Sequence, residues 1–431
     1  MADIPKIRFK GFTEPWEQCK FAAVFDGLPN NTFSRAELNY ESGTVKNVHY
    51  GDVLIKFGDY INASETELPY ISDDAKADKF KNSFLQDGDI IIADTAEDEA
   101  VGKCTEIQGS EGLKLLSGLH TIACRPKEKY GPMFLGYYIN SPAYHNQLKP
   151  LMQGIKVTSI SKSALQDTDM IMPQDIEEQE KIGEYFSNLD HLITLHQRKC
   201  DDTKELKKYM LQKMFPKNGE KFPEIRFKGF TEAWEQRKVK DISDFIDGNY
   251  GEKYPRDDEF VDSGIPFFTS AVTGSEGIFN EKNVKFISTE KNRELTKAQS
   301  QGGDLILTNR GASMGVIAEI PEKYGLVNIG PQLTRIRGKE KEANNKYLLC
   351  LFQTSTNNKK LTSMNAGSAM PFIGLKGLGN IDLLIPQYDE QLKIGEYFSC
   401  LDHFITLHQR KCDTLKELKK YMLQNMFPKK G

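Results

Sequence analysis

One long segment occurs twice in this chain, and this repeat limits the possible folds more than any other feature. The stretch at Gln179–Lys217 reads QEKIGEYFSNLDHLITLHQRKCDDTKELKKYMLQKMFPK, and it returns at Gln391–Lys429 with 33 of 39 positions identical. No Gly or Pro falls between Glu184 and Phe215. Leu, Lys, Glu and Gln dominate, so each copy favours helix. A helix of roughly 38 residues would be about 57 Å long at ~1.5 Å per residue.

One face of each copy carries side chains at alternating spacings of four and three residues, which predicts packing against another helix. We call this face the seam. It comprises Ile182, Phe186, Leu189, Ile193, His196 and Cys200 in the first copy, and Ile394, Phe398, Leu401, Ile405, His408 and Cys412 in the second. Thr203, Leu206, Met210 and Met214 extend it, as do Leu415, Leu418, Met422 and Met426. Each seam has the other copy as its simplest partner, so we predict an antiparallel, coiled-coil-like pair.

A shorter repeat starts each half of the chain. Pro5–Gln18 reads PKIRFKGFTEPWEQ and Pro223–Gln236 reads PEIRFKGFTEAWEQ, and the only two tryptophans, Trp16 and Trp234, hold matching places. Each tryptophan either stacks on a nucleic-acid base or plugs its half of the chain onto a helix. We favour the plug, because a site that reads variable sequence would not need two near-identical copies. The repeated order also predicts that Met1 and Gly431 lie near each other.

The two repeats divide the chain into four parts. We expect a first domain at 1–175 with its anchor at 5–18, a long helix at 176–216, a second domain at 217–387 with its anchor at 223–236, and a second long helix at 388–431. The domain bodies differ in sequence, but each has a Gly-Asp turn that leads into a β-rich run, at Gly88-Asp89 and Gly303-Asp304. The prediction is an α+β fold with two similar domains and a pseudo-two-fold internal repeat.

Composition restricts the class of protein. The net charge of −4 argues against a protein that coats nucleic acid through bulk charge. Seven cysteines without a CxxC pair fit a reducing cytoplasm. The first residues, MADIPKIRFKGF, contain no apolar stretch, so we expect no secretory signal.

No sequence motif for catalysis is present. The chain contains no GxxxxGK[ST] phosphate loop, GxGxxG fingerprint, Asn-Pro-Pro-aromatic tetrapeptide or HExxH motif, so we predict no catalytic residues. One group needs weighing: His196 with Cys200 and His408 with Cys412 are i,i+4 pairs that could meet as a tetrahedral zinc site. A polar layer that sets helix register is the favoured interpretation, because nothing in the spacing requires a metal.

Function then falls to the divergent bodies, which near-identical supports hold as two different reading heads. Duplex DNA is a regular polymer that offers two distinct targets at a fixed separation. The candidate DNA-binding residues are polar, basic or aromatic and lie in expected loops. They are Lys56, Tyr60, Asn62, Thr95, Lys156, Thr158 and Ser159 in the first body, and Asn249, Tyr250, Lys253, Tyr254, Thr269, Ser270, Asn309, Arg310 and Ser313 in the second. Arg and Lys can bind guanine O6 and N7, and Asn can bind adenine N6 and N7.

Taken together, the anchors IRFKGFTExWEQ, the helix motif KIGEYFSxLDxxITLHQRK and the Gly-Asp skeleton resemble the DNA-specificity (S) subunit of type I restriction–modification enzymes. The resemblance implies two target-recognition domains that each read half of a bipartite, asymmetric site. It implies conserved helices that set the unread spacer and dock two modification subunits, which hold S-adenosylmethionine and methylate adenine. Restriction subunits with ATP-driven translocation and nuclease activity would join them. This chain itself would be cytoplasmic, non-catalytic and free of cofactors, with ATP, Mg and S-adenosylmethionine in its partners.

Two other functions remain open at this point. A helical scaffold with two protein-binding heads would give no sequence-selective DNA protection when co-purified with a methyltransferase. A nuclease or methylase acting alone would turn over DNA when supplied with cofactors, and the missing motifs argue against it. For the S-subunit function, we expect weak DNA binding by the chain alone and tight, salt-sensitive binding in the complex.

Overall fold

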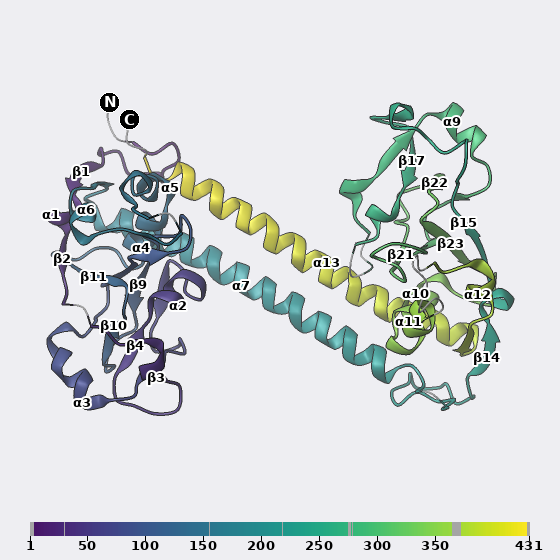
Figure 1. The fold of residues 1–431 in the computed structure, drawn as a ribbon, viewed down its shortest axis with the longest axis horizontal. Coiled ribbons are helices and arrows are strands. Elements are labelled where there is room, and N and C mark those ends of the chain that lie inside the picture. The colour runs from purple at the N-terminus through teal and green to yellow at the C-terminus, as the bar shows by residue number, and fades with distance from the viewer. Residues whose placement is uncertain are drawn as a thin grey trace. The chain divides into compact units, whose positions relative to one another are not determined.

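The computed structural model describes residues 4–29, 31–154, 156–217, 219–274, 277, 279–363 and 372–428. Two compact units make up the fold. Unit 1 comprises Met1–Gln197 with Arg410–Gly431, and unit 2 comprises Arg198–Gln409. Two helices, α7 (Ile176–Lys213) and α13 (Tyr388–Asn425), each contribute one end to each unit (Figure 1). Both are 38 residues long, which confirms the expected helix length. Among the described residues, no helix has the length and apolarity needed to cross a membrane.

The body of unit 1 is a mixed structure of short strands and short helices. Its strands are β1 (Glu17–Lys20), β2 (Phe25–Gly27), β3 (Leu38–Asn39), β4 (Lys46–Val48), β5 (Tyr60–Asn62), β6 (Tyr70–Ile71), β7 (Ile90–Ala93), β8 (Thr95–Ala96), β9 (Cys104–Gln108), β10 (Leu115–Ser117), β11 (Thr121–Pro126), β12 (Thr158–Ser159) and β13 (Asp169–Met172). Its helices are α1 (Phe21–Val24), α2 (Tyr50–Ile55), α3 (Asp74–Ala77), α4 (Phe134–Asn140), α5 (Pro142–His145) and α6 (Lys162–Gln166). The larger sheets have the orders β2-β11-β7-β9-β5 and β10-β4-β6-β3.

The body of unit 2 has a related arrangement. Its strands are β14 (Glu235–Lys238), β15 (Ser243–Asp247), β16 (Phe260–Val261), β17 (Ile265–Phe268), β18 (Lys285–Ile287), β19 (Gln299–Ser300), β20 (Leu305–Thr308), β21 (Ile317–Glu319), β22 (Val327–Ile329), β23 (Leu333–Gly338) and β24 (Asp382–Ile385). Its helices are α8 (Val239–Ile242), α9 (Thr289–Glu294), α10 (Asn345–Gln353), α11 (Ser355–Thr362) and α12 (Leu375–Gly379).

The sheets of the two bodies share a set of equivalent strands. The order β15-β23-β20-β21 repeats β2-β11-β7-β9, and the antiparallel pair β14-β24 repeats β1-β13. Parallel pairing of β17 with β22 repeats that of β4 with β10. The predicted α+β class, the two similar domains and the internal repeat are therefore confirmed.

The Gly-Asp turn fixes the central strand of each body. Gly88 has φ +88°, and the buried Asp89 accepts two hydrogen bonds from Arg125 on β11, at 2.9 and 2.7 Å. Asp89 also accepts the backbone N–H of Gln86, which closes the turn. The left-handed φ favours glycine because a Cβ would be strained there. A charged bidentate pair is stronger than a neutral hydrogen bond, so the turn holds both strands in place.

The same turn recurs in unit 2 with the same partners. Gly303 has φ +81°, and buried Asp304 accepts from Arg337 at 2.5 and 2.6 Å and from the backbone of Gln301 at 2.9 Å. The two bodies differ in sequence, but the same Gly-Asp turn and Asp–Arg pair hold the central strand of each, β7 or β20.

Each body core is closed by the ends of both long helices. In unit 1, Trp16 contacts Phe427, which follows α13, at 6.1 Å between ring centroids, and Phe427 stacks on Phe186 of α7 at 5.9 Å. In unit 2, Trp234 contacts Phe215, which follows α7, at 5.9 Å. Trp16 and Trp234 are 4% and 1% exposed. This burial supports the plug interpretation and leaves neither ring face open for a base.

The seam residues divide into two groups. Ile182, Phe186 and Leu189 belong to the core of unit 1, and Ile394, Phe398 and Leu401 to that of unit 2. Cys200, Ile405 and Cys412 are buried between the helices, whereas Ile193, His196 and His408 are half-buried. The Cys200 thiol donates to the Ile405 carbonyl at 3.8 Å, and the Cys412 thiol to the Ile193 carbonyl at 3.9 Å.

The predicted extension of the seam through Leu206 and Leu418 is wrong. These side chains are 44% and 39% exposed. A spacing of four residues after Thr203 leads to position 207, so Lys207 and not Leu206 faces the other helix. The Lys207 ammonium lies 2.7 Å from the Asp402 carboxylate of α13. The methylene groups of a lysine can lie along an apolar surface while its charge reaches a partner. The helical period, and not the hydrophobicity of each residue, therefore decides which side chain faces the other helix here.

The helices run antiparallel within each unit. In unit 1, Asp190 of α7 contacts Lys419 of α13, and Ile193, further along α7, contacts Cys412, which comes earlier in α13. In unit 2, Cys200 contacts Ile405, and Lys207, further along α7, contacts Asp402, which comes earlier in α13. Residue numbers along α7 therefore rise in the direction in which residue numbers along α13 fall.

The backbone repeats this symmetry where the two ends of the chain approach each other. Ile7 N–H donates to Asn425 O at 3.0 Å, as Ile225 N–H donates to Lys213 O at 2.9 Å. The prediction for Met1 and Gly431 lies outside the described residues.

The equivalent lysines, Lys419 and Lys207, have different surroundings. Lys419 contacts both Asp190 on α7 and Asp59 of the body, each at 2.7 Å. Burial alone lowers the pKa of Lys419, but the carboxylates of Asp59 and Asp190 raise it above its ordinary value. Lys207 has one carboxylate, Asp402, and the Gln353 side-chain carbonyl at 3.0 Å.

Replacing each lysine by methionine tests this difference. Lys419→Met leaves two carboxylates in a partly buried site, so we expect a loss of about 3 kcal/mol from the unfolding free energy of unit 1. Lys207→Met leaves only the more exposed Asp402, and the expected loss is about 1 kcal/mol in unit 2. Urea unfolding in Trp234→Phe and Trp16→Phe backgrounds would let one tryptophan report each unit. Equal losses would contradict the structural difference.

Candidate nucleic-acid interface

The central strand of each body leads directly into a set of polar loop residues. In unit 2, β20 is followed by Asn309 and Arg310, and Asn309 pairs through its backbone with Gln332 and Ile373. Asn309 N–H donates to Gln332 O at 2.9 Å, and Ile373 N–H donates to Asn309 O at 2.8 Å. The side chain of Ser270 donates to that of Gln332. We define the second tip cluster as Ser270, Asn309, Arg310, Gln332 and Phe372.

The equivalent residues of unit 1 have different chemistry. After β7, Asp94 N–H donates to His120 O at 3.1 Å, and Ile160 N–H donates to Asp94 O at 2.9 Å. Thr95 pairs with Ser159 in a short antiparallel ladder, and its hydroxyl donates to Asp94 at 2.7 Å. The His120 ring nitrogen Nδ1 lies 3.5 Å from Asp94 Oδ1. We define the first tip cluster as Asp94, Thr95, His120, Thr158 and Ser159.

The second tip cluster rests on buried polar groups. Asn309 is 0% exposed, and its amide donates to Asp247 at 3.3 Å and to the Thr334 hydroxyl at 3.0 Å. Thr334 in turn donates to Asp247 at 2.6 Å. A buried amide with all its bonds made has one orientation, because leaving it unpaired would cost free energy. Asn309 therefore supports the cluster from below and leaves its neighbour Arg310 at the surface.

A second buried amide chain supports the loop that contains Tyr250. Asn249 donates to Asn328 at 2.7 Å, and Asn328 donates to Asn292 at 2.5 Å. These three side chains are 6%, 0% and 5% exposed respectively. The candidate residue Asn249 is thus a support, whereas Tyr250 is 66% exposed and has the Lys297 ammonium 4.6 Å from its ring centroid.

The remaining candidates of the second body are divided between surface and interior contacts. Lys253 is exposed, while Thr269 and Ser313 are half-buried. Tyr254 packs edge-on against Phe267 at 5.7 Å, and burial raises the pKa of its hydroxyl.

In the first body, the pairing of β8 with β12 brings Thr95, Thr158 and Ser159 together. Lys156 is exposed. The Ser64 hydroxyl donates to the Asn62 side-chain carbonyl at 2.8 Å, and the Lys56 ammonium donates to the Glu67 backbone carbonyl at 3.3 Å. Both candidates thus have hydrogen-bond partners close to them in the sequence.

The expectation that Tyr60 belongs to an open loop is wrong. Tyr60 begins β5, its hydroxyl lies 2.8 Å from that of Ser187 on α7, and its ring contacts Tyr137 edge-on at 6.2 Å. It therefore joins the body to the helix.

Sequence reasoning missed His120 and Gln332, which lie at equivalent places beside the central strands. Neither has a motif around it, and His120 follows a Gly-Leu pair with φ 54°. Only the antiparallel pairing of β11 with β7 and of β23 with β20 brings them to the tips. An internal alignment of the two strands could have marked them as a matched pair.

The zinc alternative has no support in the part of the chain that the structure describes. No three His, Cys, Asp or Glu side chains there come together as a metal ion would require. Cys200 and Cys412 direct their thiols to backbone carbonyls and to Gln409 and Gln197 at 3.6 and 3.5 Å.

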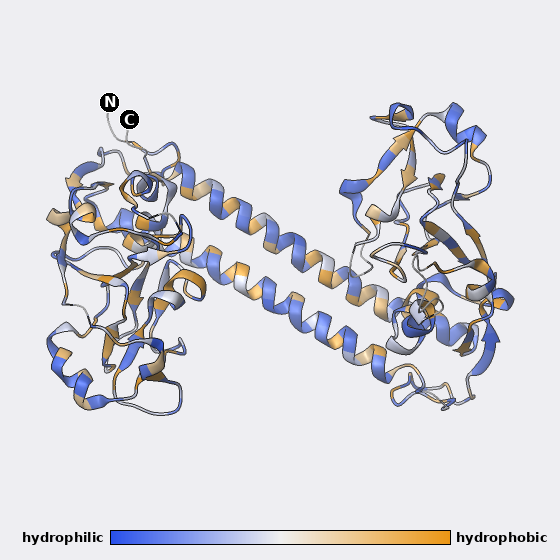
Figure 2. Ribbon diagram, in the orientation of Figure 1, coloured by the Kyte–Doolittle hydropathy of each residue, from blue (hydrophilic) through white to orange (hydrophobic). Residues whose placement is uncertain are grey.

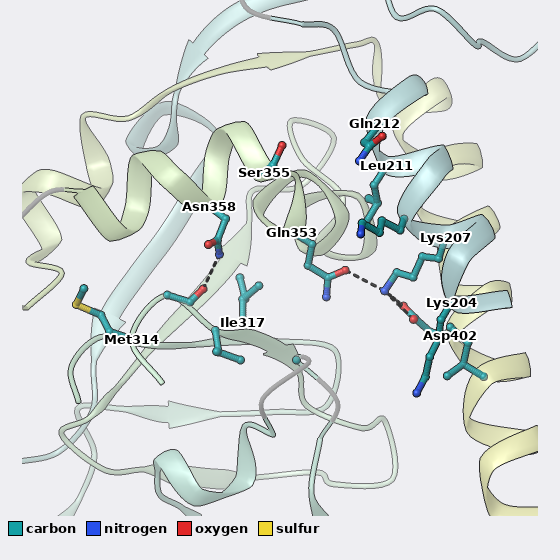
Figure 3. A pocket seen from close by; sticks show the side chains of 15 residues that line it. Lys204, Lys207, Leu211, Gln212, Met314, Ile317, Gln353, Ser355, Asn358 and Asp402 are labelled. Carbon is teal, nitrogen blue, oxygen red and sulfur yellow. Dashed lines mark hydrogen bonds and ion pairs between the residues drawn. The ribbon is translucent and has the colours of Figure 1, made fainter. Parts of the chain in front are cut away.

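Unit 2 also contains a pocket of about 560 Å³ between its part of α7 and the body (Figure 3). Lys204, Lys207 and Asp402 lie on its helical side, and Gln353 and Met314 on the body side. The equivalent place in unit 1 is occupied, because Tyr137 and Asp59 reach Asp190 and Lys419 there. Tyr137 lies four residues before Ser141, the N-cap of α5, and Cys350 lies four residues before Thr354, the N-cap of α11. Cys350 is therefore the equivalent of Tyr137 in unit 2 and has a smaller side chain.

Comparison with known proteins accounts for the repeated architecture. Residues 14–204 and 231–417 each match the family model of the type I restriction modification DNA specificity domain. The chain belongs to this family. The resemblance inferred from the anchors, the helix motif and the Gly-Asp skeleton is thereby confirmed.

Two members illustrate how far the specificity-domain family has diverged. The type I restriction enzyme MjaVIII specificity subunit of Methanocaldococcus jannaschii is 24% identical over 285 residues, which are 64% of this chain and 65% of that protein. The match thus spans a little under two thirds of the relative's length. The crystal structure of the S subunit from M. genitalium has the same fold, with a TM-score of 0.66 at 14% identity, covering 99% of this chain and 100% of that one.

Each specificity-domain segment contains one tip cluster. Asp94 to Ser159 lie within the first matched segment, and Ser270 to Phe372 within the second. The two copies keep the Gly-Asp turn, its arginine and the order of the strands around it. At the matched tip positions, Asp94, Thr95, His120 and Ser159 correspond to Asn309, Arg310, Gln332 and Phe372. Equivalent supports therefore hold side chains of different chemistry.

Removing the central amide of the Asn249–Asn328–Asn292 chain tests how the second tip region is supported. Asn328→Ala leaves two buried amides without their partner, so we expect unit 2 to lose about 2 kcal/mol of unfolding free energy. Urea unfolding followed by Trp234 in a Trp16→Phe background measures it. Exposed Asn283→Ala, which removes one bond to the Ala271 carbonyl, is the control. A loss no larger than in the control would contradict this support.

Proposed function

We propose that this chain is the sequence-reading subunit of a type I restriction–modification complex. Each body would read one half of a bipartite, asymmetric DNA site. One observation carries the proposal: equivalent supports present tips of different chemistry, Asp94 with Thr95 in one body and Asn309 with Arg310 in the other. A repeated scaffold gives both tips the same kind of approach to a duplex, and different tips would read different bases.

The long helices would set the length of the unread spacer. α7 and α13 are continuous over 38 residues, and the described part of each contains no proline. Both helices are packed into the core of each unit, and the ion pairs Lys207–Asp402 and Lys419–Asp190 join them. These contacts would resist sliding of one helix along the other. A stiff pair is a better spacer than a flexible linker, whose end-to-end distance fluctuates.

A repeated apolar surface supports docking of two modification subunits. The exposed side chains include Leu192, Leu195, Leu206 and Tyr209 on α7 and Phe404, Leu418 and Tyr421 on α13. Leu192 and Phe404, Leu206 and Leu418, and Tyr209 and Tyr421 are equivalent positions of the internal repeat. Figure 2 shows apolar positions among the hydrophilic surface of both helices. Exposed apolar side chains that recur in both copies favour two bound copies of one partner.

Catalysis would belong to the partners. Modification subunits would hold S-adenosylmethionine and methylate adenine, and restriction subunits would use ATP and Mg for translocation and cleavage in the cytoplasm. Much of the phosphate contact would also come from partners, which suits a chain with net charge −4.

Mapping methylated adenine across the genome tests this function. Cells that carry the chain with its modification subunit should show a bipartite methylated motif, and cells without the chain should not. Replacing residues 20–172 by the body of a relative should change one half-site only. Absence of sequence-selective methylation, with a correctly assembled complex, would favour a protein-binding scaffold instead.

Lengthening both helices should lengthen the spacer alone. Seven residues inserted between Leu195 and Thr203, with a matching insertion between Leu407 and Leu415, add two helical turns, about 10 Å. The methylated motif should keep both half-sites and gain about three unread base pairs, at ~3.4 Å each. Insertion into α7 alone mispairs the seam and serves as a comparison. Altered half-sites with an unchanged gap would contradict the spacer role.

Charged substitutions on the repeated surface test partner docking. Leu206→Glu should reduce the complex from two modification subunits to one, and adding Leu418→Glu should remove both, as measured by native mass spectrometry. Both side chains are exposed, so the chain alone should keep its stability. Leu326→Glu, at a side chain 46% exposed in the second body, is the control. Retention of both partners by the double variant would contradict this surface.

A further inference from the structure

Arg310 is held in a defined orientation although it lies at the surface. Its guanidinium carbon is 4.6 Å from the centroid of the Phe372 ring, and the two residues form an isolated antiparallel bridge. The flat face of an arginine stacks well on an aromatic ring, which limits its rotation. Phe372 is itself followed by Ile373, whose N–H is bound to Asn309 O.

The second restraint on Arg310 comes from below. Its Nε donates to Asn309 Oδ1 at 3.3 Å, and Asn309 is fixed by Asp247 and Thr334. Within the residues that the structure describes, Arg310 has no carboxylate partner. The stack and the Nε bond restrain the guanidinium plane, and neither contact uses the two terminal nitrogens, Nη1 and Nη2, as donors. Two parallel donors in one plane are thus available to a ligand.

We propose that Arg310 reads a guanine in the half-site of the second body, with Nη1 and Nη2 donating to O6 and N7. This inference rests on the proposed DNA-reading function and names the base. Guanine presents two acceptors side by side on its major-groove edge, and no other base does. A restrained guanidinium also fits a phosphate bidentately, so the effect of substitution on base discrimination and on salt dependence distinguishes the two contacts. The position of Arg310 at the tip, just after the central strand β20, favours the base contact.

The first body has no such fork at the equivalent position. Thr95 takes the place of Arg310, and Ser159 takes the place of Phe372, as the matching bridges show. The Thr95 hydroxyl is engaged with Asp94 at 2.7 Å. The same place on the scaffold would therefore require guanine in one half-site and leave the other half-site free of that requirement.

Three substitutions test this inference in the assembled methyltransferase complex, read out by genome-wide adenine methylation. The natural chain should require a guanine at one position of the second half-site. Arg310→Ala and Arg310→Lys should both relax that position while the first half-site and the gap stay unchanged. Competition between oligonucleotides with each base pair at that position should lose about ten- to a hundredfold discrimination. Phe372→Leu should relax the same position partially, because it frees the guanidinium.

Arg293→Ala, at an exposed arginine of α9 without an ion pair among the described residues, is the control and should leave the motif intact. Circular dichroism and complex assembly confirm folding of each variant. The inference is overturned if the second half-site contains no guanine, or if Arg310→Ala keeps full discrimination. It is also overturned if Arg310→Ala weakens all sequences equally and lowers the salt dependence of binding, which indicates a phosphate contact. Absence of any methylated motif with the natural chain would instead count against the proposed function.

Discussion

The closure of each body core by the ends of two helices is the interaction on which the rest of the molecule depends. Phe427 reaches Trp16 and Phe186 in unit 1, and Phe215 reaches Trp234 and Phe398 in unit 2. Burying large aromatic side chains is among the strongest single contributions to folding. Because the end of α7 completes unit 2 and the end of α13 completes unit 1, neither half of the chain holds a complete core of its own.

This interlocking separates stability from recognition. The aromatic closure, the Arg8–Glu178 pair at 2.6 Å and its equivalent Arg226–Glu390 pair at 2.7 Å are supports that both halves share. The tips take no part in these contacts. Residues such as Thr95 and Arg310 can therefore differ between bodies without loss of the core, which is the physical condition for one scaffold to present two specificities.

The two units share a scaffold but are not equally filled. Tyr137 and Asp59 pack around Lys419 in unit 1, whereas a pocket remains beside Lys207 in unit 2 (Figure 3). Burial also raises the pKa of Glu106 to about 7 although it accepts backbone N–H groups at the start of α4, and burial raises the pKa of its equivalent, Glu319. In unit 1, the body thus reaches both long helices at Lys419 and Asp190, where unit 2 keeps a pocket.

The sequence by itself determined the duplication, both long helices, the plugging tryptophans and the Gly-Asp turns, because each depends on local propensity or on an exact repeat. Tertiary structure alone decided the partners of residues that have no local signal. Lys207 rather than Leu206 continues the seam because helix period fixes direction, and Tyr60 faces α7 because β5 lies beside it. His120 and Gln332 reach the tips through strand pairing, and Asn309 lies beneath Arg310 because Thr334, distant in sequence, binds its amide. Such contacts between distant segments are not encoded in any short stretch, which is why most individual tip residues could be proposed only by type.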